Sequence, residues 1–167
     1  MEALAGKIRG ADGFVFVTGE YNWGMQPGLK NLTDHFIEEW FWRPAGIVSY
    51  SAGRLAGARG SVPWHGTLSE MGMVVISSTV NVGPISKTLD AQGQPIDEAG
   101  KFLEKSFARF ADDLAWWSAA ARNIPRRRCS RTTCRSCSSA RRCSGSAGSA
   151  SMPEARSGPM RLRVWRS

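Results

Sequence analysis

Cysteine is absent from the first 128 residues of this 167-residue chain, and lysine is absent from the last 43. A long cysteine-free segment suits a reducing cytoplasm. No apolar run approaches the roughly 20 residues of a membrane-spanning helix. The N-terminus, M-E-A-L-A-G-K-I-R-G, lacks the basic start and the apolar core of a secretory signal peptide. We therefore expect a cytoplasmic protein that has no contact with a membrane.

Charge divides the chain into two parts. Residues 1–124 contain 11 basic and 13 acidic side chains, a net charge of −2, whereas residues 125–167 contain 11 arginines and one glutamate, a net charge of +10. The second part is rich in Arg, Ser, Cys and Gly and has no apolar periodicity, so it cannot bury a core. Its final L-R-V-W is too short to change this. The sequence predicts one folded domain over residues 1–124 and a disordered tail over residues 125–167.

The stretch Gly13–Phe41 predicts a buried strand, a loop and a helix. Phe14–Thr18 is a short run of β-branched and aromatic residues, typical of a buried strand. A loop of Gly, Asn and Pro follows, and a helix is expected from Pro27 to about Phe41. Apolar residues at helical spacing would form one face of this helix: Leu29, Leu32, Phe36, Ile37 and Trp40.

The rest of the first part repeats this alternation. Met1–Gly10 predicts the end of a helix, and Ala45–Tyr50 and Met73–Val82 predict two further strands. The helix between them is expected to end near Met71 and to be kinked at Pro63 or to begin there. A last helix over Ile96–Asn123 carries an apolar stripe for a core or a dimer contact, formed by Leu103, Phe107, Phe110, Leu114 and Trp117. This βαβαβα order predicts a three-layer α/β sandwich with a parallel sheet.

The loop after the first strand would lie at the carboxyl edge of the sheet, where open α/β folds bind ligands. The block V-T-G-E-Y-N-W-G-M-Q-P-G-L-K-N-L-T-D resembles the NADPH-dependent FMN reductase family of flavodoxin-like proteins, whose usual pattern is P-E-Y-N-x-x-x-P-G-x-L-K-N-x-x-D. Gly19 replaces the first Pro, and the Pro27-Gly28 spacing is intact. The stretch R-P-A-G-I-V-S-Y-S-A-G-R-L-A-G-A-R resembles the family's second loop.

This resemblance implies an FMN-dependent oxidoreductase that passes hydride from NADPH or NADH through bound flavin to a quinone-like or other small oxidised acceptor. It also implies a homodimer. Flavin carries this chemistry, so neither a catalytic side chain nor a metal site is expected. The residues that the resemblance places against FMN are Glu20, Tyr21, Asn22, Trp23, Gly24, Ser49, Ser51 and Gly53.

The chain also departs from the family pattern. The family's first strand, its phosphate-binding loop with the following helix, and its second strand have no counterpart here. We expect Phe14–Thr18 to be a bare edge strand and FMN binding to be weakened, with activity impaired. The first part then reads as a truncated family domain, and the foreign composition after Pro125 is consistent with a frameshift.

Other interpretations remain open. Glu20-Tyr21-Asn22 could be a simple turn, Trp23 could cover a subunit interface, and Lys30 and Asp34 at i, i+4 could be a surface pair or a cofactor contact. The tail could instead make this a non-catalytic protein that binds nucleic acid or a partner by charge, although nucleic acid is the less favoured ligand. Incidental cysteines are favoured over an iron–sulfur site for Cys129, Cys134, Cys137 and Cys143.

Overall fold

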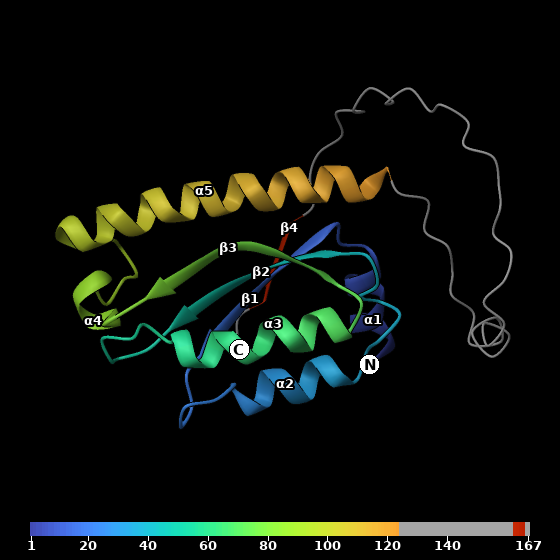
Figure 1. The fold of residues 1–167 in the computed structure, drawn as a ribbon, viewed down its shortest axis with the longest axis horizontal. Helices are drawn as coiled ribbons and strands as arrows, with labels where there is room; N and C mark the ends of the chain where they lie inside the picture. Colours follow the sequence, from blue (N-terminus) through green and yellow to red (C-terminus); the bar gives the residue numbers. More distant parts are fainter. Residues whose placement is uncertain (124–161, 166–167) are drawn as a thin grey trace, which may run out of the picture.

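The computed structural model describes residues 1–123 and 162–165, arranged in three layers (Figure 1). A parallel sheet lies in the middle, α5 covers one face, and α1, α2 and α3 lie on the other. The predicted sandwich with a parallel sheet is confirmed. The helices are α1 (Glu2–Arg9), α2 (Pro27–Asp34), α3 (Ala58–Glu70), α4 (Ile85–Thr88) and α5 (Asp97–Arg122), and the strands are β1 (Gly13–Gly19), β2 (Pro44–Tyr50), β3 (Val74–Val82) and β4 (Leu162–Trp165).

The sheet has the order β3-β2-β1-β4, and every neighbouring pair is parallel. β4 pairs with β1 over Gly13–Phe16. Two expectations are therefore wrong in part: the chain after Pro125 does form structure at Leu162–Trp165, and β1 is not a bare edge over its first half. A four-residue strand needs only an unpaired edge with free N–H and C=O groups, which β1 supplies. The four cysteines and the arginine run lie outside the described residues.

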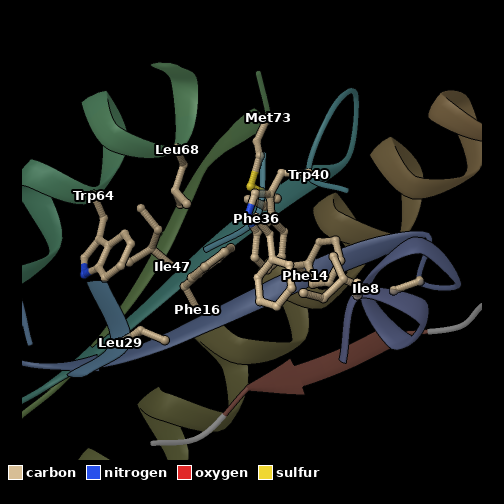
Figure 2. Packing of buried hydrophobic residues seen from close by; sticks show 13 residues of the cluster. Ile8, Phe14, Phe16, Leu29, Phe36, Trp40, Ile47, Trp64, Leu68 and Met73 are labelled. Atoms are coloured by element: carbon tan, nitrogen blue, oxygen red, sulfur yellow. The ribbon is translucent and has the colours of Figure 1, made fainter. Parts of the chain in front are cut away.

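Aromatic side chains fill the core between the sheet and α1, α2 and α3 (Figure 2). Phe14 and Phe16 point from β1 into this layer and meet Trp40, with ring centroids 4.9 and 5.8 Å apart. Trp64 from α3 lies 5.6 Å from Phe16 and is fully buried. Because aromatic rings bury large apolar areas and prefer tilted pairs, this cluster anchors α3 and the turns after α2 to β1.

A second core lies under α5. Phe110 and Leu114 are buried against the sheet, as the apolar stripe predicted, while Phe107 and Trp117 are 46% and 40% exposed. Beside α5 an apolar groove of about 600 Å³ runs between the sheet and Leu103. Within residues 1–123 and 162–165, no helix combines the length and the apolar content needed to cross a bilayer.

The predicted helix over Pro27–Phe41 is too long, because α2 ends at Asp34. Its periodic apolar residues are nevertheless used: Phe36 and Trp40 are buried, but from irregular turns rather than from a helical face. The indole N–H of Trp40 donates to the Thr33 carbonyl at 3.1 Å, and this carbonyl also accepts the backbone N–H of Phe36 at 3.2 Å. Trp40 therefore packs its ring against the end of α2, while Ile37 is left half exposed.

The helix α3 begins at Ala58, five residues before Pro63, so Pro63 lies inside it rather than at its start. Proline has no N–H to donate to the carbonyl of Arg59, four residues earlier, and this part of the first turns lacks a normal ladder bond. The packing of Trp64 and Leu68, both fully buried, compensates for it. Helix α3 therefore starts early enough to bring Arg59 to the carboxyl edge of the sheet.

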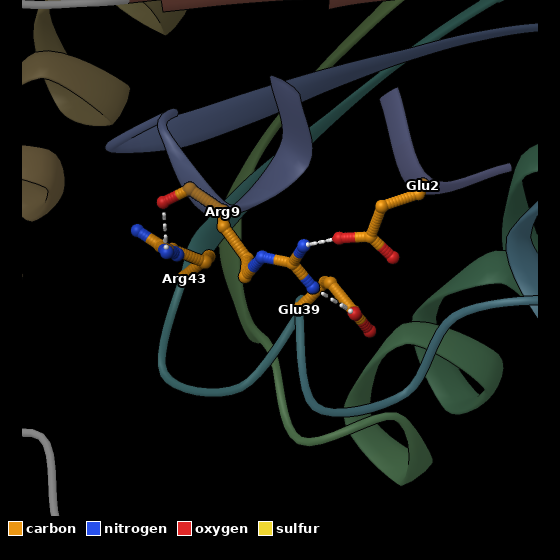
Figure 3. Close-up of polar contacts among 4 residues, drawn as sticks. All are labelled: Glu2, Arg9, Glu39 and Arg43. Atoms are coloured by element: carbon orange, nitrogen blue, oxygen red, sulfur yellow. Dashed lines mark hydrogen bonds and ion pairs between the residues drawn. The ribbon is translucent and has the colours of Figure 1, made fainter. Parts of the chain in front are cut away.

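Arginine ties the end of α1 to the start of β2 (Figure 3). The buried Arg43 guanidinium donates to the backbone carbonyls of Arg9, at 2.7 Å, and of Ala11. Arg9 in turn pairs with Glu39 at 2.8 Å and with Glu2. These hydrogen bonds join a buried cation to backbone carbonyls at and just after the end of α1, so they fix the end of the sheet opposite the predicted ligand edge.

Candidate functional site

Three loops meet at the carboxyl edge of the sheet, where β1, β2 and β3 end at Gly19, Tyr50 and Val82. Backbone hydrogen bonds join them in sequence: Glu20 N–H donates to the Tyr50 carbonyl at 3.3 Å, and Ser51 N–H donates to the Val82 carbonyl at 3.1 Å. The two loops that carry all the predicted cofactor residues are therefore neighbours, as the parallel sheet order requires.

The tip of the first loop is a tight turn. Tyr21 and Gly24 exchange both backbone hydrogen bonds, at 3.1 and 2.8 Å. Asn22 and Trp23 lie between them with φ of 45° and 72°, which is the geometry of a two-residue type I′ turn. Asparagine tolerates this region of backbone space, but a bulky side chain held there costs about 1–3 kcal/mol. A strained tryptophan at a loop tip is a reason to look for a function.

The side chains of this turn divide into buried and exposed groups. The Glu20 side chain is only 8% exposed and pairs with the Arg59 guanidinium, from the first turn of α3. The Arg59 guanidinium carbon also lies 4.1 Å from the centroid of the Trp23 ring, a cation–π contact. Tyr21 and Trp23 are 52% and 71% exposed. One arginine thus contacts both the buried and the exposed side of the loop.

The second loop is held from within. Ser49 is fully buried, and its hydroxyl oxygen lies 2.9 Å from the Ala56 carbonyl and 2.7 Å from the Asn81 side-chain oxygen. The single hydroxyl proton of Ser49 can be donated to only one of these two oxygens. With the Asn81 side-chain amide turned by 180°, its NH₂ group donates to the Ser49 oxygen, and the Ser49 hydroxyl donates to the Ala56 carbonyl. The Ser51 hydroxyl donates to the Gly53 carbonyl at 3.1 Å. Both serines shape the loop through these bonds.

Two glycines let the loops approach each other. A Cβ atom on Gly60 would lie 3.0 Å from the Glu20 Cα and 3.1 Å from the Gly24 carbonyl oxygen. Gly57 has a φ of 78°, and its Cβ would lie 2.7 Å from the Tyr50 carbonyl oxygen. Side chains at either position would push α3 or the second loop away from the first. Close backbone approach is therefore built into this edge.

The loops also present backbone donors. In the part of the chain that the structure describes, the hydrogen bonds within the two loops do not use the backbone N–H groups of Asn22, Trp23, Ala52 or Gly53. Exposed N–H groups in neighbouring turns attract an oxygen-rich or negatively charged edge of a ligand. Lys30 and Asp34, 2.5 Å apart, form an i, i+4 pair on α2 with side chains 35% and 50% exposed.

The structure thus brings together the predicted residues Glu20, Tyr21, Asn22, Trp23 and Gly24 in one turn, and places Ser51 and Gly53 in the neighbouring loop, with Ser49 buried beneath it. Sequence reasoning missed Arg59, Gly60 and Asn81. The one signal available for Arg59 was its place at the end of the quoted stretch S-A-G-R-L-A-G-A-R.

Comparison with known proteins decides the family. The family model described as NADPH-dependent FMN reductase matches residues 1–86, just over half of the chain. The chain belongs to this family. The match includes both loops of the site, so the resemblance seen in the E-Y-N block is confirmed.

Individual relatives of this family member match shorter stretches of it. The NAD(P)H-dependent FMN reductase C4B3.06c of Schizosaccharomyces pombe is 55% identical over 49 residues, which is 29% of this chain and 24% of that protein. PA1204 of Pseudomonas aeruginosa, also an NAD(P)H-dependent FMN reductase, is 31% identical over 108 residues, 62% of this chain and 58% of that protein. A quinone reductase of Escherichia coli is 43% identical over 63 residues, which is 35% of this chain and 34% of that protein.

Among solved structures, FerB, a flavoenzyme NAD(P)H:(acceptor) oxidoreductase from Paracoccus denitrificans, superposes with a TM-score of 0.60 at 23% identity, over 69% of this chain and 67% of that one. This likeness confirms the fold. The chain spans between about a quarter and three-fifths of the length of the curated FMN reductases named above.

Proposed function

We propose that this chain binds FMN between the loop Glu20–Gly24 and the loop Ser51–Gly57 and acts as an NAD(P)H-dependent reductase of small oxidised acceptors such as quinones. The observation that carries the proposal is the meeting of these two loops at the carboxyl edge of a parallel sheet, with exposed backbone donors on both. The names of its relatives, FMN reductases and a quinone reductase, support the same substrate class.

The residues present fit the flavin ring. FMN is planar, with carbonyl oxygens along one edge, and the N–H groups of Asn22, Trp23, Ala52 and Gly53 are donors without a partner inside the loops. Such donors stabilise negative charge at that edge when the ring is reduced. Bound FMN supplies the hydride chemistry that no side chain in these loops provides. The protein's part is to orient the ring and to keep the donors in place.

Several parts of this proposal go beyond the fold. The homodimer is carried over from the family resemblance, and the cytoplasmic location rests on the cysteine-free sequence of residues 1–124. The choice of acceptor is also carried over from the resemblance, and either NADPH or NADH fits the loops as the reductant. The direct test of the site is a titration of FMN with the protein at fixed salt, in which binding is measured by the quenching of flavin fluorescence.

Saturable binding is expected, and Asn22→Ala should weaken it because the variant loses the residue that best tolerates the left-handed turn. Asn31→Ala is the matched control, since Asn31 is exposed on α2 and contributes nothing to either loop. NAD(P)H oxidation coupled to a benzoquinone then tests turnover. Absence of any saturable FMN binding to the full chain would refute the proposal.

A further inference from the structure

We propose that Arg59 is the positioning residue of the flavin site: its guanidinium fixes the turn Tyr21–Gly24 by holding Glu20 and Trp23 at once. The inference rests on the proposed function, because the turn it fixes carries two of the backbone donors assigned to FMN. It does not make Arg59 a ligand of the flavin. Arg59 acts through the loop that it organises.

The start of helix α3 places Arg59 against the first loop. Helix α3 begins at Ala58, so Arg59 is its second residue, and Gly60 lets the helix start lie directly against the first loop. The Glu20 side chain is 92% buried and ends on the Arg59 guanidinium. Arginine is the residue suited to this place, because its planar charged group keeps its charge when buried and can contact two partners along its edge and its face.

The turn Tyr21–Gly24 is strained. Trp23 has a φ of 72° and is 71% exposed, so contacts with the hydrophobic core do not hold it in that conformation. Two backbone hydrogen bonds close the turn, and the Arg59 guanidinium stacked 4.1 Å from the indole centroid is the side-chain contact that secures its tip. A cation–π contact of this kind favours the strained conformer over relaxed ones.

The ion pair between Glu20 and Arg59 leaves some of its polar atoms without hydrogen-bond partners. Glu20 Oε2 and Arg59 Nε are buried and have no hydrogen-bond partner within the described residues. The Glu20 side chain is 8% exposed and the Arg59 side chain 35%, so desolvation of the carboxylate offsets much of the attraction and the pair contributes little to net stability. A role in fixing the geometry of the loop explains why such a pair stands at this edge.

The test compares Arg59→Gln and Arg59→Lys with Arg109→Gln. Arg109 is an exposed arginine on α5, so its variant removes the same charge without touching either loop of the site. Circular dichroism first establishes that each variant is folded. The first readout uses the protein without FMN: the indole N–H resonance of Trp23 and the amide resonances of Asn22 and Gly24 in a ¹⁵N-labelled sample, with Trp23 assigned from Trp23→Phe.

Arg59→Gln should move these resonances and raise the Kd for FMN about tenfold or more, because a buried carboxylate loses its cation and the turn is freed. Arg59→Lys should give a Kd and turn resonances between those of Arg59→Gln and those of the unmodified chain, since a lysine ammonium cannot stack on Trp23 and pair with Glu20 in one geometry. Arg109→Gln should stay within about twofold of the unmodified chain, as expected for an exposed charge far from the site.

Two results would overturn the inference. Arg59→Gln with unchanged turn resonances means that the backbone closes the turn unaided. Arg59→Lys equal to the unmodified chain in both readouts means that charge alone matters and that stacking on Trp23 has no part. If the full chain binds no FMN, the proposed function fails, yet the flavin-free resonances still decide whether Arg59 positions the turn.

Discussion

Replacement of Gly57 by alanine should destabilise the chain through the second loop of the site. Gly57 has a φ of 78°, where a residue with a Cβ is disfavoured by about 1–2 kcal/mol. The added Cβ would lie 2.7 Å from the Tyr50 carbonyl oxygen and 2.8 Å from the Tyr50 nitrogen, where ordinary contacts begin at 3.4 Å. Both neighbours are backbone atoms of β2, so neither can rotate away.

The expected cost combines these two effects. Overpacking against a rigid neighbour adds about 1–3 kcal/mol, so the total is roughly 2–5 kcal/mol out of about 5–15 kcal/mol for a typical domain. A domain of this size loses on the order of 4 °C in Tm for each kcal/mol, which predicts a fall of roughly 8–20 °C. Thermal unfolding followed by circular dichroism measures it.

Two other glycines serve as controls for the separate effects. Gly93 has a φ of 77° but open space around its Cβ position, so Gly93→Ala should show the conformational cost alone, about 1–2 kcal/mol. Gly66 lies inside α3 with nothing near it, and Gly66→Ala should stabilise the chain by about 0.5–1 kcal/mol. If Gly57→Ala unfolds at the same temperature as Gly93→Ala, the close approach to β2 carries no energy and this reasoning is refuted.

Two further substitutions and one deletion test the packing of the sheet. Trp64→Phe removes the 3.2 Å bond from the indole N–H to the Thr18 hydroxyl and should lower the free energy of unfolding, measured by urea titration, by about 1–2 kcal/mol. Gly46→Ala should clash with the Phe110 ring and cost about 1–3 kcal/mol, with recovery in the double variant that also carries Phe110→Leu; additive losses would contradict the contact. Deletion of residues 162–167 should uncover the edge of β1 and raise light scattering at equal concentration, and unchanged scattering would mean that β4 does not protect that edge.

The elements of the fold that follow from local pattern could be predicted from the sequence. β1, β2 and β3 were predicted within one residue of each end, because short β-branched runs between loops leave no room for a helix. The C-terminal limit of α2 could not be predicted, since Phe36 and Trp40 keep helical spacing while lying outside a helix. Periodicity records which residues are buried, and it cannot tell a continued helix from turns that bury the same side chains.

The strand β4 could not be predicted from the sequence, for a different reason. Four residues after a long polar stretch carry no strand signal of their own, and their pairing depends on a free edge 149 residues earlier in the chain. Sequence reasoning identified that edge as a liability but treated it as exposed. A strand with an unpaired edge and a short apolar segment elsewhere in a chain are better considered together, because each can supply the backbone hydrogen-bond partners that the other lacks.

The site shows the same division between local and tertiary information. The turn Tyr21–Gly24 is a local feature, and its motif located it. Arg59 stands 36 residues after Trp23, and only the crossover from β1 through α2 and β2 to α3 brings the two into contact. A motif therefore locates the backbone that meets the ligand, whereas the side chain that holds this backbone in a strained shape belongs to the next βα unit. In a parallel sheet, the neighbouring loop at the carboxyl edge is the first place to search for such a residue.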